Sequence, residues 1–222
     1  MNKPGSVMLI LELPEPPLRQ LADRYASEAE ALGIQVLEVP LERAARESFD
    51  TIKSRIESNG LLAAIIHVAV GWPLSECETK PCLVSPRDHL ALWDFAEYSP
   101  RDAGGSVAFL DISHPYDEAL LHMAEQTARE MQMIWASEVI ASHPCPWILT
   151  PTEKAILQRT GCQTVTRIVP LTAKLARAFG IPVLGILALP EWKQDATFTD
   201  IGESLEGFLD RLFENIRCVG DL

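Results

Sequence analysis

The sequence predicts an α/β protein with a doubly wound, mostly parallel sheet and helices on both faces of that sheet. Short apolar runs of strand length recur along the chain, and amphipathic stretches with helical spacing separate them. One run, residues 61–70, is wholly apolar, which is typical of a central parallel strand covered on both faces. Because strand and helix alternate to the end, we expect right-handed crossovers and one Rossmann-like domain over residues 1–222.

The first part of the chain has the clearest pattern. An apolar strand is predicted at residues 7–11, followed by a helix over residues 18–32 whose apolar side chains share one face. Gly33 is expected to end this helix, since glycine readily adopts the backbone conformation that follows a helix. A second strand at residues 34–39 and a second helix at residues 46–58 complete the pattern before the apolar third strand.

The stretch from residue 104 to residue 151 is expected to organise the rest of the fold. It should contain a buried strand at residues 106–113, a helix of about seven turns and a short strand at residues 147–150. The helix is predicted from residues that recur at spacings of three and four on one face: Ala119, Leu120, Met123, Ala124, Thr127, Met131, Ile134, Trp135 and Ile140.

The other segments are less regular. Residues 71–105 are expected to form an irregular excursion with a weak helical segment at residues 86–97. Residues 153–180 should be helical, broken near Gly161 and bent near Pro170. The last two elements are expected to be a buried strand and an amphipathic helix, at residues 182–189 and 201–216.

Composition narrows the class of protein. A chain of 222 residues with 47% hydrophobic residues can bury one core without disulfides or metals. It has no run of 18 apolar residues and no apolar block of the signal-peptide kind near its start, so we expect a soluble cytoplasmic protein. The net charge of −12 argues against nucleic acid as a partner and leaves room for a basic protein.

The cysteines do not predict a metal site or a disulfide framework. Cys77 and Cys82 form an isolated pair, and Cys145, Cys162 and Cys218 are scattered along the chain. A zinc site would need two such pairs, or a pair with histidines at the right spacing. We therefore expect no bound metal.

In its order of segments, the chain from residue 7 to about residue 190 resembles a short-chain dehydrogenase/reductase. Residues 66–71, Ile-His-Val-Ala-Val-Gly, stand where that family has a strand ending in N-N-A-G. Residues 104–113 stand where it has G-G-x-I-V-N-I-S-S, residues 147–151 where it has a strand ending in P-G, and Ala136-Ser-Glu138 where it often has A-x-E. The resemblance implies a parallel sheet of the type found in that family.

The residues that bind the cofactor in this family are replaced here. The family has a glycine-rich turn after its first strand, where the backbone approaches the pyrophosphate of a dinucleotide. This chain has Glu12, Pro14, Glu15, Pro16 and Pro17 in that place. Prolines remove backbone N–H donors and the two carboxylates repel an anion, so we expect no dinucleotide cofactor.

The catalytic residues of the family are also replaced. Its tyrosine and lysine correspond by spacing to Leu121 and Glu125, and only Ser113 resembles the catalytic serine. Leucine cannot donate a proton, and glutamate has the wrong charge to assist a tyrosine. A second alignment, in which residues 164–190 take this place, lacks the same two residues, and the chain contains no Y-x-x-x-K pair.

Two other groups of residues could carry chemistry. Ser113, His114, Tyr116 and Asp117 follow the expected strand end and could form a relocated site that uses no dinucleotide, although Asp117 more simply caps the next helix. His67 lies in an apolar strand and is predicted to be a core histidine with one hydrogen-bonded nitrogen.

The hypothesis that follows is a non-catalytic subunit that pairs with and stabilises a catalytic short-chain dehydrogenase, such as one acting on acyl-CoA or acyl-carrier substrates. In the family it resembles, the long helix forms the subunit seam, which implies an interface at Met123, Thr127, Met131, Ile134 and Trp135. The alternatives are an enzyme with a relocated site near Ser113, His114 and Tyr116, and a small-ligand sensor on the same frame.

Overall fold

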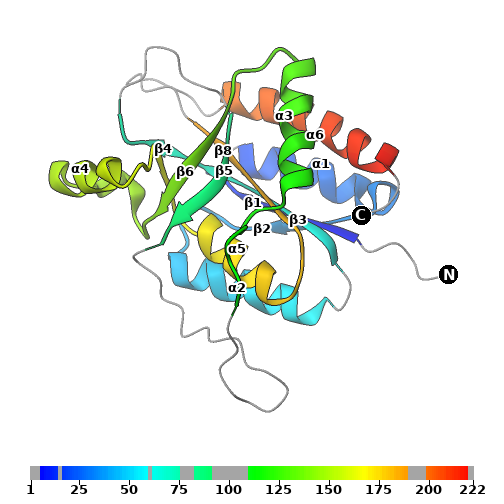
Figure 1. Ribbon diagram of the computed structural model, residues 1–222. Coiled ribbons are helices and arrows are strands. Elements are labelled where there is room, and N and C mark those ends of the chain that lie inside the picture. The colour runs from blue at the N-terminus through cyan, green and yellow to red at the C-terminus, as the bar shows by residue number, and fades with distance from the viewer. Residues whose placement is uncertain are drawn as a thin grey trace.

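The computed structural model describes residues 6–14, 17–59, 62–75, 83–91, 110–189 and 199–219. Figure 1 shows a twisted sheet through the middle of these residues, with helices packed against it. The helices are α1 (Pro17–Leu32), α2 (Ala45–Ser58), α3 (Glu118–Glu130), α4 (Pro151–Arg159), α5 (Val169–Ala178) and α6 (Thr199–Val219), with a short 3-10 helix at Pro146–Ile148. None of the helices within these ranges has the length and apolar character needed to cross a bilayer.

The sheet has eight strands in the order β2-β1-β3-β8-β5-β6-β7-β4. They are β1 (Ser6–Glu12), β2 (Ile34–Glu38), β3 (Leu62–Val70), β4 (Trp72–Pro73), β5 (Leu83–Leu90), β6 (Trp135–Ser142), β7 (Thr164–Thr166) and β8 (Val183–Ala188). The pairs among β2, β1, β3 and β8 are parallel, but β5 pairs antiparallel with β8, and β4 pairs antiparallel with β7. β5 and β7 each pair parallel with β6, so five of the seven strand pairs are parallel. The prediction of an α/β fold with a mostly parallel sheet is confirmed, but the two antiparallel pairs make this a mixed, curled sheet and not the doubly wound sheet that was expected.

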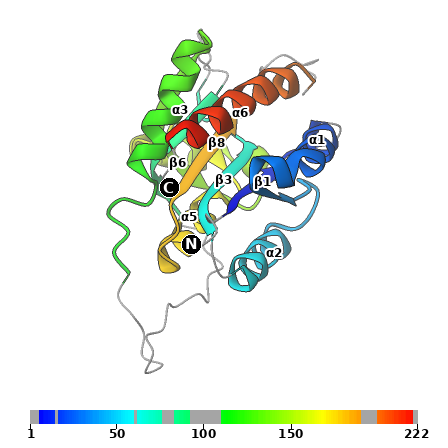
Figure 2. The ribbon, with the colours of Figure 1, turned by 90° about the vertical axis from the view of Figure 1, so that its right-hand side faces the viewer.

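Two helical layers cover the central strands. One core cluster joins α1, α3 and α6 to one face of the sheet, and another joins α2 and α5 to the other face, as Figure 2 shows. Successive residues of β1 alternate between these clusters: Leu9 and Leu11 lie in the first, and Met8 and Ile10 lie in the second. Burial on both faces explains why these strands read as continuous apolar runs.

The first part of the chain agrees with the sequence pattern. β1, α1, β2, α2 and β3 all form within one or two residues of their expected ranges. Gly33 has a φ of +67°, which glycine adopts without the steric cost that a Cβ would bring. This region was predictable because its strands are parallel and its helices cover them directly.

The sheet curls back on itself beyond β3. β4 follows β3 in sequence after Gly71 and pairs with β7, which lies near the far end of the strand order. The hydroxyl of Thr166, in β7, donates to the backbone oxygen of Val70, the last residue of β3 (3.1 Å). A Cβ on Gly71 would lie 2.8 Å from Thr164, so glycine allows this close approach. The curl brings the end of β7 next to the end of β3.

The predicted long helix was wrong beyond its first half. α3 ends at Glu130, Gln132 has a φ of +56°, and residues 135–142 form β6. The expected strand at residues 147–150 is instead a 3-10 turn and the Thr150 cap of α4. Residues 110–113 are not in a strand, and residues 106–109 lie outside the described residues. Apolar spacing continued past the helix because β6 is itself half-buried between β5 and β7.

Two more segments were assigned to the wrong structure. Residues 83–90 form β5 instead of an irregular and weakly helical segment, and a register shift between Pro86 and Asp88 accommodates the proline in the strand. Residues 92–97 lie outside the described residues. The expected helix at residues 153–180 is α4, β7 and α5, broken at Gly161 as predicted, but Pro170 lies in the first turn of α5 and does not bend it.

A glycine in the middle of the sheet generates a stability prediction. A Cβ on Gly185, in β8, would lie 2.7 Å from the ring of Pro86 in β5 and 3.0 Å from Val169. We expect Gly185→Ala to lower the free energy of unfolding by about 1–3 kcal/mol, because the ring and backbone must shift. Gly207→Ala in α6 is the matched control: its Cβ would meet only Met131 at 3.5 Å, so we expect a gain of about 0.5–1 kcal/mol from helix propensity. Urea unfolding of both variants tests this, and equal effects of the two changes would contradict it.

Glu138 in β6 generates a pH-dependent prediction. Burial raises the pKa of its carboxyl, although the hydroxyl of Thr164 donates to it at 2.7 Å. The protonated form is therefore favoured in the folded state, and its contribution to stability is lost as the pH rises from the unfolded pKa through the folded pKa. We expect Glu138→Gln to raise the stability at pH 7 by roughly 1 kcal/mol, since the amide oxygen keeps the bond without the buried charge.

The control for this prediction is Glu38→Gln, at the exposed end of β2. Thermal unfolding at several pH values should show the advantage of Glu138→Gln shrinking as the pH falls to about 3, below the ordinary glutamate pKa of about 4.3, where the carboxyl is protonated in both states. An advantage that stays constant with pH, or a loss of stability at pH 7, would contradict the prediction.

Candidate functional site

The topology of the sheet places a candidate site at the carboxyl ends of β1 and β3. The chain passes from β1 through α1 to β2, and then returns through α2 on the other face to β3, on the opposite side of β1. In open α/β sheets, ligands bind outside the carboxyl ends of the strands where the winding direction changes in this way. The last residues of β1 and β3 are therefore the first place to look for functional side chains.

A buried acid occupies this position. Glu12 is the last residue of β1 and only 1% exposed. Its Oε2 atom lies 3.5 Å from Nε2 of His67, which projects from β3 and is fully buried. Its Oε1 atom lies 3.4 Å from Nε of Arg167, which follows β7 and is 1% exposed. We call these three side chains, Glu12, His67 and Arg167, the Glu12 cluster.

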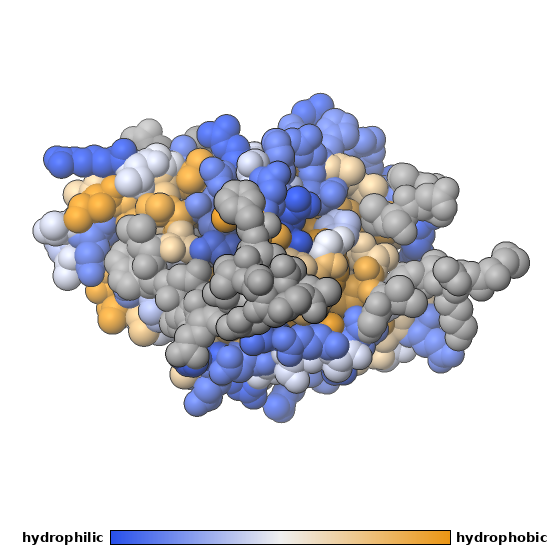
Figure 3. All heavy atoms as spheres, turned by 60° about the horizontal axis from the view of Figure 1, so that its bottom comes forward, coloured by the Kyte–Doolittle hydropathy of each residue, from blue (hydrophilic) through white to orange (hydrophobic). Residues whose placement is uncertain are grey.

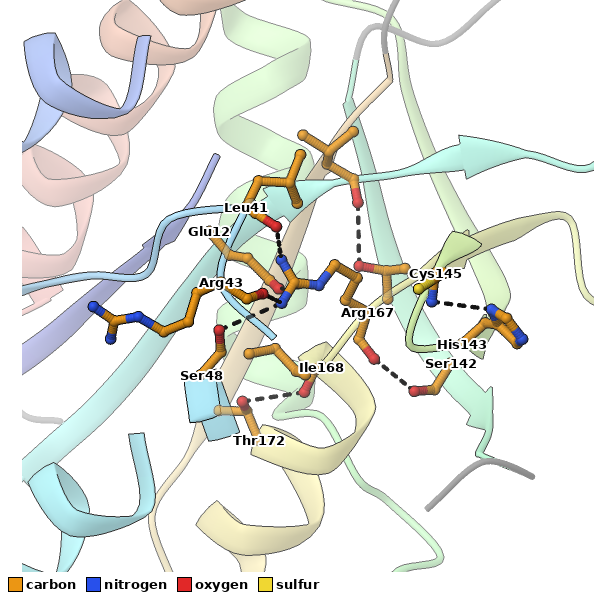
Figure 4. A network of polar contacts seen from close by, with 12 residues as sticks. Glu12, Leu41, Arg43, Ser48, Ser142, His143, Cys145, Arg167, Ile168 and Thr172 are labelled. Carbon is orange, nitrogen blue, oxygen red and sulfur yellow. Dashed lines mark hydrogen bonds and ion pairs between the residues drawn. The ribbon is translucent and has the colours of Figure 1, made fainter. Parts of the chain in front are cut away.

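Arg167 reaches the cluster because the sheet curls. Figure 4 shows its guanidinium group between Glu12 and the segment that connects β2 to α2. One terminal nitrogen, Nη1, donates to the backbone oxygen of Leu41. The other, Nη2, donates to the backbone oxygen of Arg43 at 2.6 Å and to the hydroxyl of Ser48 at 3.3 Å. Arg167 therefore ties β7 to the β2–α2 connection and to the start of α2.

The hydrogen bonds around His67 indicate its tautomer. The hydroxyl of Thr172 donates its hydrogen to the backbone oxygen of Ile168 (3.2 Å), so it accepts from Nδ1 of His67, 3.1 Å away. Nδ1 therefore carries a hydrogen, and in the neutral ring Nε2 has only a lone pair. Nε2 then faces a carboxylate oxygen, and two acceptors at 3.5 Å need a proton or a donor molecule between them.

The cluster is charged and incompletely hydrogen-bonded. Both contacts of Glu12 are longer than the 2.7–2.9 Å of a strong charge-assisted hydrogen bond. Within the described residues, no hydrogen bond is made by Oε1 and Oε2 of Glu12, Nε2 of His67 or Nε of Arg167. Buried polar groups are almost always hydrogen-bonded. Four buried polar atoms without a hydrogen bond in one cluster are therefore unusual and indicate a functional role. Chemically, the carboxylate and the imidazole can take up or release a proton.

Only part of the cluster could be found from the sequence. The sequence pattern marks Glu12 only as a residue that disfavours dinucleotide binding, whereas in the structure it is the centre of the cluster. Pro14, two residues further on, is buried; Glu15 and Pro16 lie outside the described residues, and Pro17 begins α1. His67 is buried with Nδ1 hydrogen-bonded, as predicted. Arg167 was missed, although a single arginine within the apolar run of residues 164–171 was a usable signal.

The proposed relocated site lies at the opposite edge of the sheet. The backbone N–H of Asp117 donates to the oxygen of Val183, the first residue of β8, so this segment is at the amino end of that strand. Asp117 caps α3 through the N–H of Leu120, as predicted. Ser113 and His114 are exposed, and His114 pairs with Glu118 at 3.3 Å. This segment does not lie at the carboxyl end of β8, which is the end of a strand where ligands bind in open α/β sheets.

A hollow of about 290 Å³ accompanies this amino-end segment. Tyr116, Arg177 and Gly180 are among the residues that line it. Burial raises the pKa of the Tyr116 hydroxyl well above its ordinary value, and this hydroxyl makes no hydrogen bond within the described residues. Its ring packs edge-on against His89 of β5, so Tyr116 fills space between β5 and the loop before α3.

The positions implied by the dehydrogenase resemblance lie on α3. Glu125 is exposed and pairs with Arg129 (3.1 Å), and Leu121 is half-buried. Of the expected interface residues, Thr127 accepts a hydrogen bond from Asn215 of α6, and Trp135 stacks on Phe208 of the same helix. Met123 also packs against this core, whereas Met131 and Ile134 are exposed at 37% and 52%. Most of this face therefore packs inside the chain, against α6.

Other groups in the described ranges do not add a second site. No cluster of three or more histidine, cysteine, aspartate or glutamate residues there could hold a metal ion. Cys145 and Cys162 are free thiols in this part of the chain, and Cys77 and Cys82 lie outside it. Trp147, Ile148 and Ile156 are large apolar residues exposed in or near α4. Figure 3 shows orange surface in several separate places rather than in one patch. Scattered apolar residues are common on protein surfaces.

The ion pair in the Glu12 cluster generates a prediction. Arg167→Met leaves the Glu12 carboxylate buried without its cation, so we expect a loss of about 3–5 kcal/mol in the free energy of unfolding. The double variant with Glu12→Gln should lose less than the sum of the single losses by more than ~1 kcal/mol. Arg43→Met is the control, because its backbone oxygen is kept and only a 3.3 Å contact with Thr51 is removed. Chemical unfolding measures all four; additive losses would contradict the prediction.

Comparison with known proteins corrects the family resemblance. No protein-family model and no curated protein matches the chain. Solved structures do match: Schistosoma purine nucleoside phosphorylase in complex with hypoxanthine has a TM-score of 0.72 at 18% identity, over 95% of this chain and 90% of that one. Native futalosine hydrolase of Helicobacter pylori strain 26695 has a TM-score of 0.69 at 16% identity, over 96% and 99%. Helicobacter pylori MTAN has 0.66 at 15%, over 94% and 99%.

The hypothesis of a short-chain dehydrogenase subunit is therefore wrong, and so is the partnership with a catalytic dehydrogenase. The mixed and curled sheet, with β5 antiparallel to β8, is not the sheet which that hypothesis required. At 15–18% identity the matches show a shared fold and no more. This chain has the fold of the nucleoside phosphorylases and hydrolases.

Proposed function

We propose that this chain binds a nucleoside at the carboxyl ends of β1 and β3 and breaks its N-glycosidic bond. The observation that carries the proposal is the Glu12 cluster: a buried acid and imidazole with unmade hydrogen bonds, at the position where the winding of the sheet reverses. The shared fold supports this, because its other members include a purine nucleoside phosphorylase and a futalosine hydrolase.

The chemistry of the bond suits these side chains. As the bond between C1′ of the sugar and nitrogen of the base breaks, positive charge develops on the sugar, as it does in glycoside cleavage. A carboxylate held in a water-poor site stabilises such charge far more than it would in water. Glu12 supplies this charge, Arg167 fixes its position from one side and His67 lies on the other.

Glu12 is 1% exposed, so a nucleoside can reach its carboxylate only if the residues packed around it move apart. A carboxylate buried to this extent is kept from water, which strengthens its interaction with a positive charge.

The experiment is an assay for release of free base. The wild-type chain is incubated with inosine, adenosine, guanosine and futalosine, and the base is measured by liquid chromatography. We expect release from at least one of them and a fall of about 10²-fold or more in kcat for Glu12→Gln. Glu38→Gln, an exposed carboxylate at the end of the neighbouring strand β2, should keep wild-type activity.

A second variant separates chemistry from folding. Glu12→Gln leaves Arg167 without its anion and is expected to unfold more easily, so circular dichroism must show that the assayed sample is folded. His67→Gln keeps the ion pair and should also lower kcat. If the folded wild-type chain releases no base from any of the nucleosides, or if both variants are as active as wild type, the proposal fails.

A further inference from the structure

We infer that Thr172 is a positioning residue of this site: it keeps the ring hydrogen of His67 on Nδ1, so that His67 donates no hydrogen bond to the Glu12 carboxylate. The inference rests on the proposed function, because it concerns how the negative charge of Glu12 is kept for the substrate. Thr172 acts on the reaction through His67 and is not itself a catalytic residue.

The sheet and α5 bring these three side chains together on one face. Ile10 of β1 and Ala69 of β3 lie in the core cluster that joins the sheet to α2 and α5. Because side chains alternate along a strand, Glu12 and His67 project to this same face. Ile10 is the register partner of His67, so Glu12 lies two residues further toward the carboxyl end. Thr172 belongs to α5, which packs against β3 on this face.

Thr172 is polar at a position where packing alone favours an apolar residue. It is fully buried, and its neighbours on α5 are buried apolar residues: Val169, Leu171, Ala173, Leu175 and Ala176. Valine would fill nearly the same space without the cost of burying a hydroxyl. The hydroxyl of Thr172 has two partners, Nδ1 of His67 at 3.1 Å and the backbone oxygen of Ile168 at 3.2 Å. Figure 4 shows the bond to Ile168.

These two partners set the direction of both hydrogen bonds. A hydroxyl has one hydrogen, and a backbone oxygen can only accept, so Thr172 donates to Ile168. Helical threonines commonly donate in this way to the residue four positions earlier. The hydroxyl oxygen then accepts from Nδ1 of His67. A hydrogen on Nδ1 leaves Nε2 of the neutral ring without one.

The consequence is a carboxylate that His67 does not neutralise. Nε2 of His67 lies 3.5 Å from Oε2 of Glu12, and in the described part of the chain neither atom makes a hydrogen bond. A hydrogen on Nε2 would bond to the carboxylate and stabilise its charge before any substrate arrived. In the proposed reaction this charge stabilises the positive charge that develops on the sugar. Thr172 therefore prevents a hydrogen bond that would compete with the substrate.

The experiment observes the ring nitrogens of His67 by NMR. Protein with 15N-labelled histidine is studied at about pH 8, above the ordinary histidine pKa of about 6.5. The His67→Gln variant identifies the signals of His67, and nitrogen chemical shifts show which ring nitrogen carries hydrogen. We expect Nδ1 to carry it in the wild type. In Thr172→Val a hydrogen on Nδ1 would lose its acceptor, so it should move to Nε2, where Glu12 accepts it.

Two further variants test whether the hydroxyl is responsible. Thr172→Ser keeps the hydroxyl and should keep the hydrogen on Nδ1. Thr127→Val is the matched control, because Thr127 is also buried in a helix and also donates to the backbone oxygen four residues earlier, that of Met123 (2.8 Å). Thr127 likewise accepts from a side chain, that of Asn215 (2.9 Å). It lies in α3, on the other face of the sheet, so its loss should leave His67 unchanged.

The base-release assay measures the effect on the reaction. With the nucleoside that is cleaved, we expect Thr172→Val to lower kcat about tenfold or more, since a histidine held in the wrong tautomer impairs the chemical step. KM should stay within about twofold, because the lost interaction acts in the transition state. Thr172→Ser should recover most of the wild-type kcat, and Thr127→Val should retain it. Circular dichroism confirms that each assayed variant is folded.

The outcomes separate the two proposals. A wild-type ring with hydrogen on Nε2, or on both nitrogens, would overturn the role of Thr172, and so would a Thr172→Val variant with the wild-type spectrum or the wild-type kcat. If the wild-type chain releases no base, the proposed function fails. The spectra still decide in that case whether Thr172 holds the hydrogen of His67 on Nδ1, since they require no substrate.

Discussion

The buried contact between Glu12 and Arg167 is the constraint on which the carboxyl edge of this molecule depends. Each charge loses its hydration on burial, and neither would be tolerated without the other. The hydrogen bonds of Arg167 to Leu41, Arg43 and Ser48 offset part of the lost hydration. They also join the end of β7 to the connection between β2 and α2. Glu12 brings in β1, and through His67 it brings in β3 and Thr172 of α5. Elements from both halves of the chain therefore meet around one ion pair.

That contact is possible only because the sheet curls. In an open parallel sheet with the order observed here, β7 would lie five positions from β1 and could not reach its end. The short strand β4 crosses back directly after β3, and the absent side chain of Gly71 lets Thr164 approach. Ser142 of β6 fixes the same corner by donating to the backbone oxygen of Arg167 at 2.6 Å. The topology and the cluster thus support each other. The curl of the sheet places Arg167 beside Glu12, and the hydrogen bonds of Arg167 hold the end of β7 in that position.

The sequence predicted strands β1, β2, β3 and β8 well and strands β5, β6 and β7 poorly, for a physical reason. β1, β3 and β8 are buried on both faces, so hydrophobicity alone marks them. β5 contains a proline and a register shift, and half of its residues are partly exposed, so its pattern resembles a loop. β6 follows α3 after a short turn at Gln132, and its apolar residues extend the helical spacing by coincidence. Pairing partners are set by tertiary contacts, which periodicity cannot report. Arg167 was missed for the same reason, since its role appears only when β7 is placed beside β3.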